Sequence, residues 1–101
     1  MDLVEEVDGS TVTVRLNGEL DMATATAFEQ AVTARMTAPE IATVVISFGG
    51  LTFTDSAGLT SLVAIQERAE REGVALVLTD VSRHVRKLME ITSLLGTFDV
   101  R

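Results

Sequence analysis

The residues best placed for chemistry stand in one short segment, Asp55-Ser56-Ala57-Gly58. An apolar, β-branched run precedes this segment and a stretch of helical periodicity follows it, so we expect Ser56 where a strand passes into a helix. Hydrolases place a nucleophilic serine on a G-x-S-x-G turn, but here Thr54 stands in place of the first glycine. A hydrolase would also need a base, and the one histidine, His84, lies among basic residues in another predicted helix. We therefore expect no catalytic residue and no enzyme activity.

Two roles are open for Ser56 at the start of a helix. An Asp or Ser there can cap the helix by accepting a hydrogen bond from a first-turn N–H group. Alternatively, the free N–H groups and the positive dipole end would stabilise a phosphoryl group on the hydroxyl. The chain has no ATP-binding motif, so that group would come from another protein.

Gly58 favours the second role, because a glycine in the first helical turn costs up to ~1 kcal/mol relative to alanine. In this interpretation the glycine clears space beside Ser56 for a bulky group or another backbone. We therefore predict that Gly58→Ala, provided that the residue has a helical φ, leaves the fold as stable as before or slightly more so and weakens the binding of a partner.

Composition excludes several other classes of function. The 101 residues carry a net charge of −7, one histidine and no cysteine, which excludes disulfides, thiolate nucleophiles and multi-histidine metal sites. An acidic chain is also a poor nucleic-acid binder, because such binding depends on neutralising phosphates with Lys and Arg. The first residues do not form a signal peptide, and the longest uncharged apolar stretch, residues 41–48, is far shorter than the ~20 residues of a membrane span. We expect one cytoplasmic domain with no cofactor, no membrane contact and no direct nucleic-acid contact.

The hydrophobic pattern alternates between the periods of strands and of helices. It predicts strands at residues 3–7, 11–16, 41–48, 74–78 and 97–100, and helices at residues 22–36, 56–72 and from Ser82 onward. The order ββαβαβαβ predicts an α/β fold with a small, mostly parallel sheet that begins with an N-terminal antiparallel hairpin.

Boundary residues and burial can also be predicted. Asp21 is expected to cap the first helix, Gly18 to end the second strand and Gly49-Gly50 to end the third. The runs at residues 41–48 and 74–78 lack polar alternation, which is typical of parallel strands that are buried on both faces.

Three motifs stand in order along the chain: NGELD at residues 17–21, LTFTDSAGL at residues 51–59 and VSRHVRKLMEIT at residues 81–92, with Leu94 and Phe98 in the tail. Together these motifs resemble the STAS domain, and within it the stand-alone anti-sigma-factor antagonists of bacteria. The resemblance covers nearly the whole chain. It implies a single STAS domain over residues 1–101, with βα-superhelix connectivity around the sheet.

The resemblance also implies functional residues. In such antagonists the serine directly after the Asp is phosphorylated, which points to Ser56 as the phosphorylation site. The residues expected to contact a partner are Asp21, Thr54, Asp55, Ser56, Ala57, Gly58 and Leu59. Two positions depart from the family pattern: Ala57 replaces a second hydroxyl residue, and Ser93 replaces a frequent glycine after Ile91-Thr92.

The resemblance implies a partner-switching cycle. In this cycle the unphosphorylated chain binds an anti-sigma factor that is also a serine/threonine kinase, and a sigma factor is released. The kinase then phosphorylates Ser56, the complex dissociates, and a phosphatase restores the antagonist. Physically, a phosphate adds a charge of about −1.5 to −2 beside Asp55. A helix N-terminus tolerates this charge, whereas a desolvated protein interface does not. The charge expected on the exposed faces separately favours a monomer when the chain is free.

Several alternatives stay open at this point. The chain could be a STAS subunit of another assembly, such as a lipid-transport ATPase complex or a stressosome-like scaffold. An acyl carrier protein also has an Asp-Ser at a helix start, but it is all-helical, and the strands predicted here argue against it. The basic residues of the third helix are either a solvated surface or a patch that steers an acidic partner: Arg83, Arg86 and Lys87.

Overall fold

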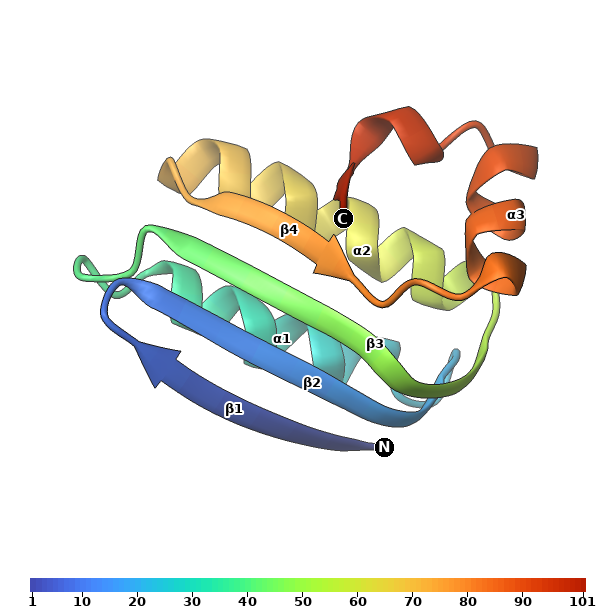
Figure 1. The fold of residues 1–101 in the computed structure, drawn as a ribbon, viewed down its shortest axis with the longest axis horizontal. Coiled ribbons are helices and arrows are strands. Elements are labelled where there is room, and N and C mark those ends of the chain that lie inside the picture. The colour runs from blue at the N-terminus through green and yellow to red at the C-terminus, as the bar shows by residue number, and fades with distance from the viewer.

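The computed structural model describes all 101 residues and contains a five-stranded sheet with helices (Figure 1). Its elements, in chain order, are β1 (Asp2–Asp8), β2 (Thr11–Leu20), α1 (Ala25–Met36), β3 (Thr43–Thr54), α2 (Ser56–Glu72), β4 (Ala75–Thr79), α3 (Arg83–Ile91), the short 3-10 helix η1 (Leu95–Thr97) and β5 (Asp99–Val100). Apart from η1, this is the order that the hydrophobic pattern predicts.

The sheet has the strand order β1-β2-β3-β4-β5. Strands β1 and β2 form an antiparallel hairpin in which Asp8 pairs with Thr11, and Gly9 takes a positive φ of 61° in the turn. The pairs β2–β3, β3–β4 and β4–β5 are all parallel. The predicted α/β class, with a mostly parallel sheet and an N-terminal hairpin, is confirmed.

Helices cover one face of the sheet and leave the other open. In Figure 1, α1 and α2 lie behind the strands, and no helix crosses the face toward the viewer. Strands β2 to β5 follow one another across the sheet in sequence order, so crossovers of one hand place their helices on the same side. Helices therefore cover β3 and β4 on one face only, and the predicted burial of the other face holds at some residues and not at others. The helix-facing residues of β3 and β4 are fully buried, with Val44, Ile46 and Leu78 at 0% exposure.

Burial on the open face is less complete but still substantial. Val45 and Thr79 are half-buried there, whereas Val77 is only 6% exposed. The predicted burial of Val77 is thus confirmed, although no helix packs on its side of the sheet. On the helix side the core joins strands and helices through residues such as Leu16, Phe28 and Leu62.

Neither Gly18 nor Gly49-Gly50 ends a strand, contrary to prediction. Strand β2 continues to Leu20 and β3 continues to Thr54, with two shifts of register along their pairing. Gly18 accommodates one shift with a φ of 106°. A Cβ on Gly50 would lie 2.9 Å from the carbonyl oxygen of Leu16, so this glycine allows β2 to approach closely. The extension brings Leu20 beside Thr54 at the carboxyl end of the sheet.

The helix starts differ from one another. Helix α1 begins at Ala25 rather than Met22, because residues 21–24 form a turn in which Asp21 accepts hydrogen bonds from the N–H groups of Ala23 and Thr24, at 2.9 and 3.2 Å. Asp21 therefore orders the turn before the helix and does not cap α1 itself.

The boundaries of α2 and α3 agree with the sequence. Helix α2 runs from Ser56 to Glu72 as predicted, and Gly73 ends it with a φ of 69°. Ser82 caps α3 by accepting a hydrogen bond of 3.2 Å from the N–H group of Val85. Beyond α3, Ser93 stands where the resemblance expects glycine, and it takes a φ of 60°.

Candidate functional site

The site predicted around Ser56 lies at the carboxyl ends of β2 and β3. Leu20 pairs with Thr54 in the last register position, and the N–H group of Asp55 donates to the carbonyl oxygen of Leu20 at 3.4 Å. This pairing places Asp21 and Asp55 one residue beyond the ends of adjacent parallel strands. The starts of α1, α2 and α3 all lie at this end of the sheet, on the right of Figure 1.

Asp55, not Ser56, caps α2. The backbone of Asp55 is extended, and its Oδ1 accepts a hydrogen bond from the N–H group of Gly58 at 3.1 Å. Its carbonyl oxygen accepts the first helical bond, from the N–H group of Leu59 at 3.2 Å. Of the two roles open for Ser56, capping is thereby excluded.

Ser56 is the first residue of α2, and its side chain is exposed. Its hydroxyl makes no hydrogen bond within the chain, whereas its carbonyl oxygen accepts one from the Thr60 hydroxyl at 2.9 Å. The N–H groups of a first helical turn have no partner inside the helix, and the helix dipole is positive there. The Ser56 hydroxyl therefore stands free in surroundings that favour a negative charge.

Gly58 allows close packing within the chain, whereas we expected from the sequence that it leaves space for a partner. The residue is buried, and a Cβ on it would collide with Oγ1 of Thr54 and lie 2.6 Å from the carbonyl oxygen of Leu20. The space beside this glycine is thus filled by the chain itself. The prediction that Gly58→Ala leaves the stability of the fold unchanged is wrong, because the added side chain would separate α2 from the end of β2.

The predicted contact residues divide into a buried set and an accessible set. Thr54 and Leu59 are 5% and 2% exposed, and with Gly58 they hold the loop and the first turn of α2 in place. The structure brings the other four to the surface at the same end of the sheet: Asp21, Asp55 and Ala57, which are half-buried, and Ser56, which is exposed.

Sequence reasoning missed two exposed apolar side chains at this end. Met22 follows Asp21 and is 82% exposed, and Phe53 precedes Thr54 and is 50% exposed. Exposed large apolar residues beside a polar site are typical of protein-binding surfaces. The signal was available, because Met22 directly follows one motif, Phe53 lies within another, and neither fits the apolar stripe of a predicted element.

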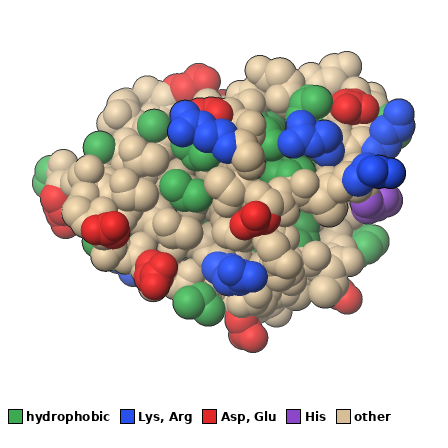
Figure 2. All heavy atoms as spheres, in the orientation of Figure 1, with side chains coloured by type: hydrophobic (Ala, Val, Ile, Leu, Met, Phe, Trp, Pro, Cys, Tyr) green, Lys and Arg blue, Asp and Glu red, His purple; other side chains and the backbone are tan.

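Helix α3 adds a positively charged surface. Its residues Arg83, Arg86 and Lys87 are exposed, and the only ion pair among them is the 3.9 Å contact from Lys87 to Glu90. In Figure 2, Lys and Arg side chains gather beside the histidine at one edge of the molecule. His84 is exposed and lies among these basic residues on α3, the helix expected for it from the sequence. Both interpretations of this patch, solvated surface or steering patch, stay open.

No helix of the structure has the length and apolar character that a membrane crossing requires. No group of three or more His, Cys, Asp or Glu side chains is arranged to hold a metal ion.

Comparisons with known proteins point to one family. The family model described as "Mlab, STAS domain" matches residues 3–98. A solved anti-sigma factor antagonist from Mycobacterium paratuberculosis is 29% identical, with a TM-score of 0.83 over 98% of this chain and 83% of that chain.

Two further structures share the fold at lower identity. The Bacillus cell fate determinant SpoIIAA in its phosphorylated form is 23% identical, with a TM-score of 0.75 over 99% of this chain and 91% of that chain. A sulfate transporter family protein from Wolinella succinogenes is 18% identical, with a TM-score of 0.78 over 94% of this chain and 79% of that chain.

Proposed function

The chain belongs to the STAS domain family, and we propose that within this family it acts as an anti-sigma-factor antagonist that is switched by phosphorylation of Ser56. The observation that carries the proposal is the free, exposed hydroxyl of Ser56 on the first residue of a helix that Asp55 already caps. The similarity to the mycobacterial antagonist over nearly the whole chain supports the same class of function.

The partner in this proposal is an anti-sigma factor with serine/threonine kinase activity. The unphosphorylated chain binds it in the cytoplasm through the end of the sheet that carries Asp21, Asp55, Ser56 and Ala57, and a sigma factor is released. Met22 and Phe53 supply apolar area that the partner would bury. The chain is a binding module in this cycle; the kinase and a phosphatase perform the chemistry.

Local electrostatics explain why phosphorylation would end binding and leave the fold intact. A phosphate on Ser56 would add a charge of about −1.5 to −2 next to the carboxylate of Asp55. The positive end of the α2 dipole and its first-turn N–H groups offset that charge within the chain. A partner that buries the same surface would desolvate clustered negative charges, which is costly without pairing.

One alternative is favoured by a specific comparison. A similar structure is that of a sulfate transporter family protein, so the same surface could dock within a transport assembly, such as a lipid-transport ATPase complex, without a kinase. Intact mass spectrometry of the protein from its native host separates these functions, because only the switching proposal requires a phosphorylated form of the chain.

A labelling experiment tests the phosphorylation site. Wild type, Ser56→Ala and Ser10→Ala are incubated with a candidate anti-sigma kinase from the same genome and labelled ATP. Ser10 is an exposed serine in the β1–β2 turn and serves as the matched control. We expect label on wild type and Ser10→Ala and none on Ser56→Ala. Equal labelling of wild type and Ser56→Ala would place the phosphate on another hydroxyl, such as that of Thr60, and refute the assignment.

A binding experiment tests the switch. Ser56→Ala should bind the kinase and stay bound when ATP is added. Ser56→Asp should fold normally and bind at least about tenfold more weakly, although a carboxylate carries less charge than a phosphate. Wild-type affinity for Ser56→Asp, together with unchanged binding of the phosphorylated protein, would show that charge at this position does not control the complex.

A further inference from the structure

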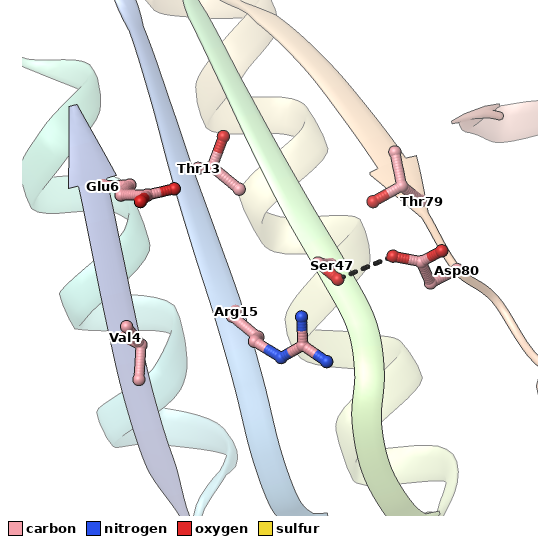
Figure 3. Close-up of a pocket in the computed structure, with 7 residues that line it drawn as sticks. All are labelled: Val4, Glu6, Thr13, Arg15, Ser47, Thr79 and Asp80. Atoms are coloured by element: carbon pink, nitrogen blue, oxygen red, sulfur yellow. Dashed lines mark hydrogen bonds between the residues drawn. The ribbon is translucent and has the colours of Figure 1, made fainter. Parts of the chain in front are cut away.

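A polar pocket lies on the open face of the sheet, and none of the predicted site residues lines it. Its volume is about 450 Å³, and it is lined by Val4, Glu6, Thr13, Arg15, Ser47, Thr79 and Asp80. This volume falls within the range of about 300–1,000 Å³ that is usual for small-molecule sites. Figure 3 shows side chains from β1, β2, β3 and the end of β4 standing on the same side of the sheet.

Three different polar groups converge above Gly49. A Cβ on this glycine would lie 3.2 Å from Nη2 of Arg15, 3.7 Å from Oγ of Ser47 and 3.7 Å from Cβ of Asp80. The missing side chain therefore keeps open a space between a guanidinium, a hydroxyl and the base of a carboxylate side chain. Asp80 is held at this place by the Ser47 hydroxyl, which donates to its Oδ2 at 2.9 Å, and its backbone has a φ of 56°.

The charged groups of the pocket are not neutralised by each other. Arg15 and Glu6 take part in no hydrogen bond or ion pair between side chains, and Asp80 accepts only the bond from Ser47. A guanidinium binds a carboxylate through two parallel hydrogen bonds, so Arg15 is suited to a ligand carboxylate. Glu6 and Asp80 are suited to cationic groups. The lining thus offers two negative charges and one positive charge.

The same lining excludes other ligand classes. Val4 is the one apolar residue, so a lipid or another apolar molecule would find no complementary surface. No aromatic ring lines the pocket, so a nucleobase would have no stacking partner. Two carboxylates flank the single guanidinium, which disfavours phosphates and other multiply charged anions.

We propose that this pocket binds a basic amino acid of the lysine and arginine class. The ligand carboxylate pairs with Arg15, its α-ammonium with Asp80 and its side-chain cation with Glu6. Glu6 lies on β1 and Asp80 directly follows β4, three strands away. Their backbones are therefore about 14 Å apart across the sheet at the usual strand spacing, and Asp80 lies three residues further along, which suits a ligand with a long side chain. This inference does not depend on the proposed function at Ser56.

Ligand titration followed by amide NMR tests the proposal on the whole chain. L-lysine should give saturable shifts at Arg15, Ser47 and Asp80. L-norleucine lacks the side-chain cation and cadaverine lacks the carboxylate, so each should bind at least about tenfold more weakly. No saturable shift with L-lysine or L-arginine, or equal affinity for L-norleucine, would overturn the proposal.

Variants of the pocket locate the binding. Arg15→Gln, Asp80→Asn and Gly49→Ala should each lower the affinity for L-lysine by at least about tenfold. Asparagine tolerates the left-handed backbone of residue 80 and still accepts from Ser47, so Asp80→Asn should fold. Gly96→Ala is the control for Gly49→Ala, because nothing lies within 4 Å of a Cβ there.

A charge control completes the set. Arg83→Gln removes a positive charge from α3 and leaves the pocket unchanged. It should bind L-lysine as wild type does. If Arg83→Gln and Arg15→Gln changed the affinity equally, the overall charge of the chain would explain binding and the pocket assignment would fail. Far-UV circular dichroism confirms that each variant is folded.

Discussion

Helices α1 and α2 begin at the same end of the sheet, and each has a hydroxyl residue at its start, but the two hydroxyls differ in their contacts. The Thr24 hydroxyl accepts a hydrogen bond of 3.0 Å from the N–H group of Asp21 and donates one of 2.9 Å to the carbonyl oxygen of Glu19. The Ser56 hydroxyl has no partner within the chain and is exposed. The first is committed to the fold, whereas the second is available for modification.

The two helices are also held against the sheet by different interactions. At α2, a buried glycine packs directly on the end of β2, and Asp55 caps the helix. At α1, polar contacts order the preceding turn, and the ion pair between Arg35 and Glu5 joins the C-terminal end of the helix to β1. Close packing holds Ser56 in a defined position, which is what a modification site at an interface requires.

The largest expected effect tests the packing at α2. Gly58→Ala should lower the free energy of unfolding by about 1–3 kcal/mol, because the added methyl group collides with the backbone of Leu20 and the side chain of Thr54. Urea unfolding measures the change, with Gly96→Ala as the control in open space. Unchanged stability would mean that the first turn of α2 can shift, and the contrast with α1 would lose its basis.

The next effect tests the Thr24 hydroxyl, which forms hydrogen bonds within the fold. Thr24→Val keeps the shape of the side chain and removes both hydrogen bonds of the hydroxyl, so we expect a loss of about 1–2 kcal/mol in the free energy of unfolding. The same urea experiment measures it. An unchanged free energy of unfolding would show that these hydrogen bonds add nothing to stability. The Thr24 hydroxyl would then contribute no more to the fold than the Ser56 hydroxyl does.

A smaller, pH-dependent effect tests the ion pair between α1 and β1. The hydrogen bond from the Arg35 guanidinium lowers the pKa of Glu5 below its ordinary value; partial burial opposes this, and the positive charge adds to it. Because the pKa is lower in the folded chain, the pair stabilises the fold above the unfolded-state pKa, and this contribution disappears as the pH falls through the folded value.

Glu5→Gln should therefore lower the free energy of unfolding by about 0.2–1 kcal/mol at neutral pH, a range that allows for the exposure of both side chains. The difference from wild type should vanish at a pH below the Glu5 pKa and shrink in high salt. A difference that is the same at both pH values would assign the effect to packing of the side chain and not to its charge.

The smallest expected effect is the sharpest test of the comparison. Ser56→Ala should change the free energy of unfolding by less than about 0.5 kcal/mol, because no hydrogen bond of the fold is lost. Thermal or urea unfolding beside Thr24→Val measures it directly. A loss comparable to that of Thr24→Val would reveal a structural bond at Ser56 and weaken its assignment as a free acceptor of phosphate.

Local signals in the sequence were sufficient for the order of elements and for α2 and α3. The period of the apolar residues, the Asp before Ser56 and the glycine at position 73 act within one or two helical turns, so their effect can be read without the fold. The same holds for the Ser82 cap and for the exposed charges of α3. The resemblance of the motifs correctly indicated the family.

Contacts between residues far apart in the chain decided the rest. Gly58 packs on Leu20, and Gly50 lies against Leu16, so both glycines serve close approach between strands and helices rather than a partner or a strand end. The one-sided cover of the sheet follows from the order of its strands, and the polar pocket needs side chains from four strands. A local sequence pattern does not predict these contacts, because the residues meet only after the sheet has formed and its crossovers have placed the helices on one face.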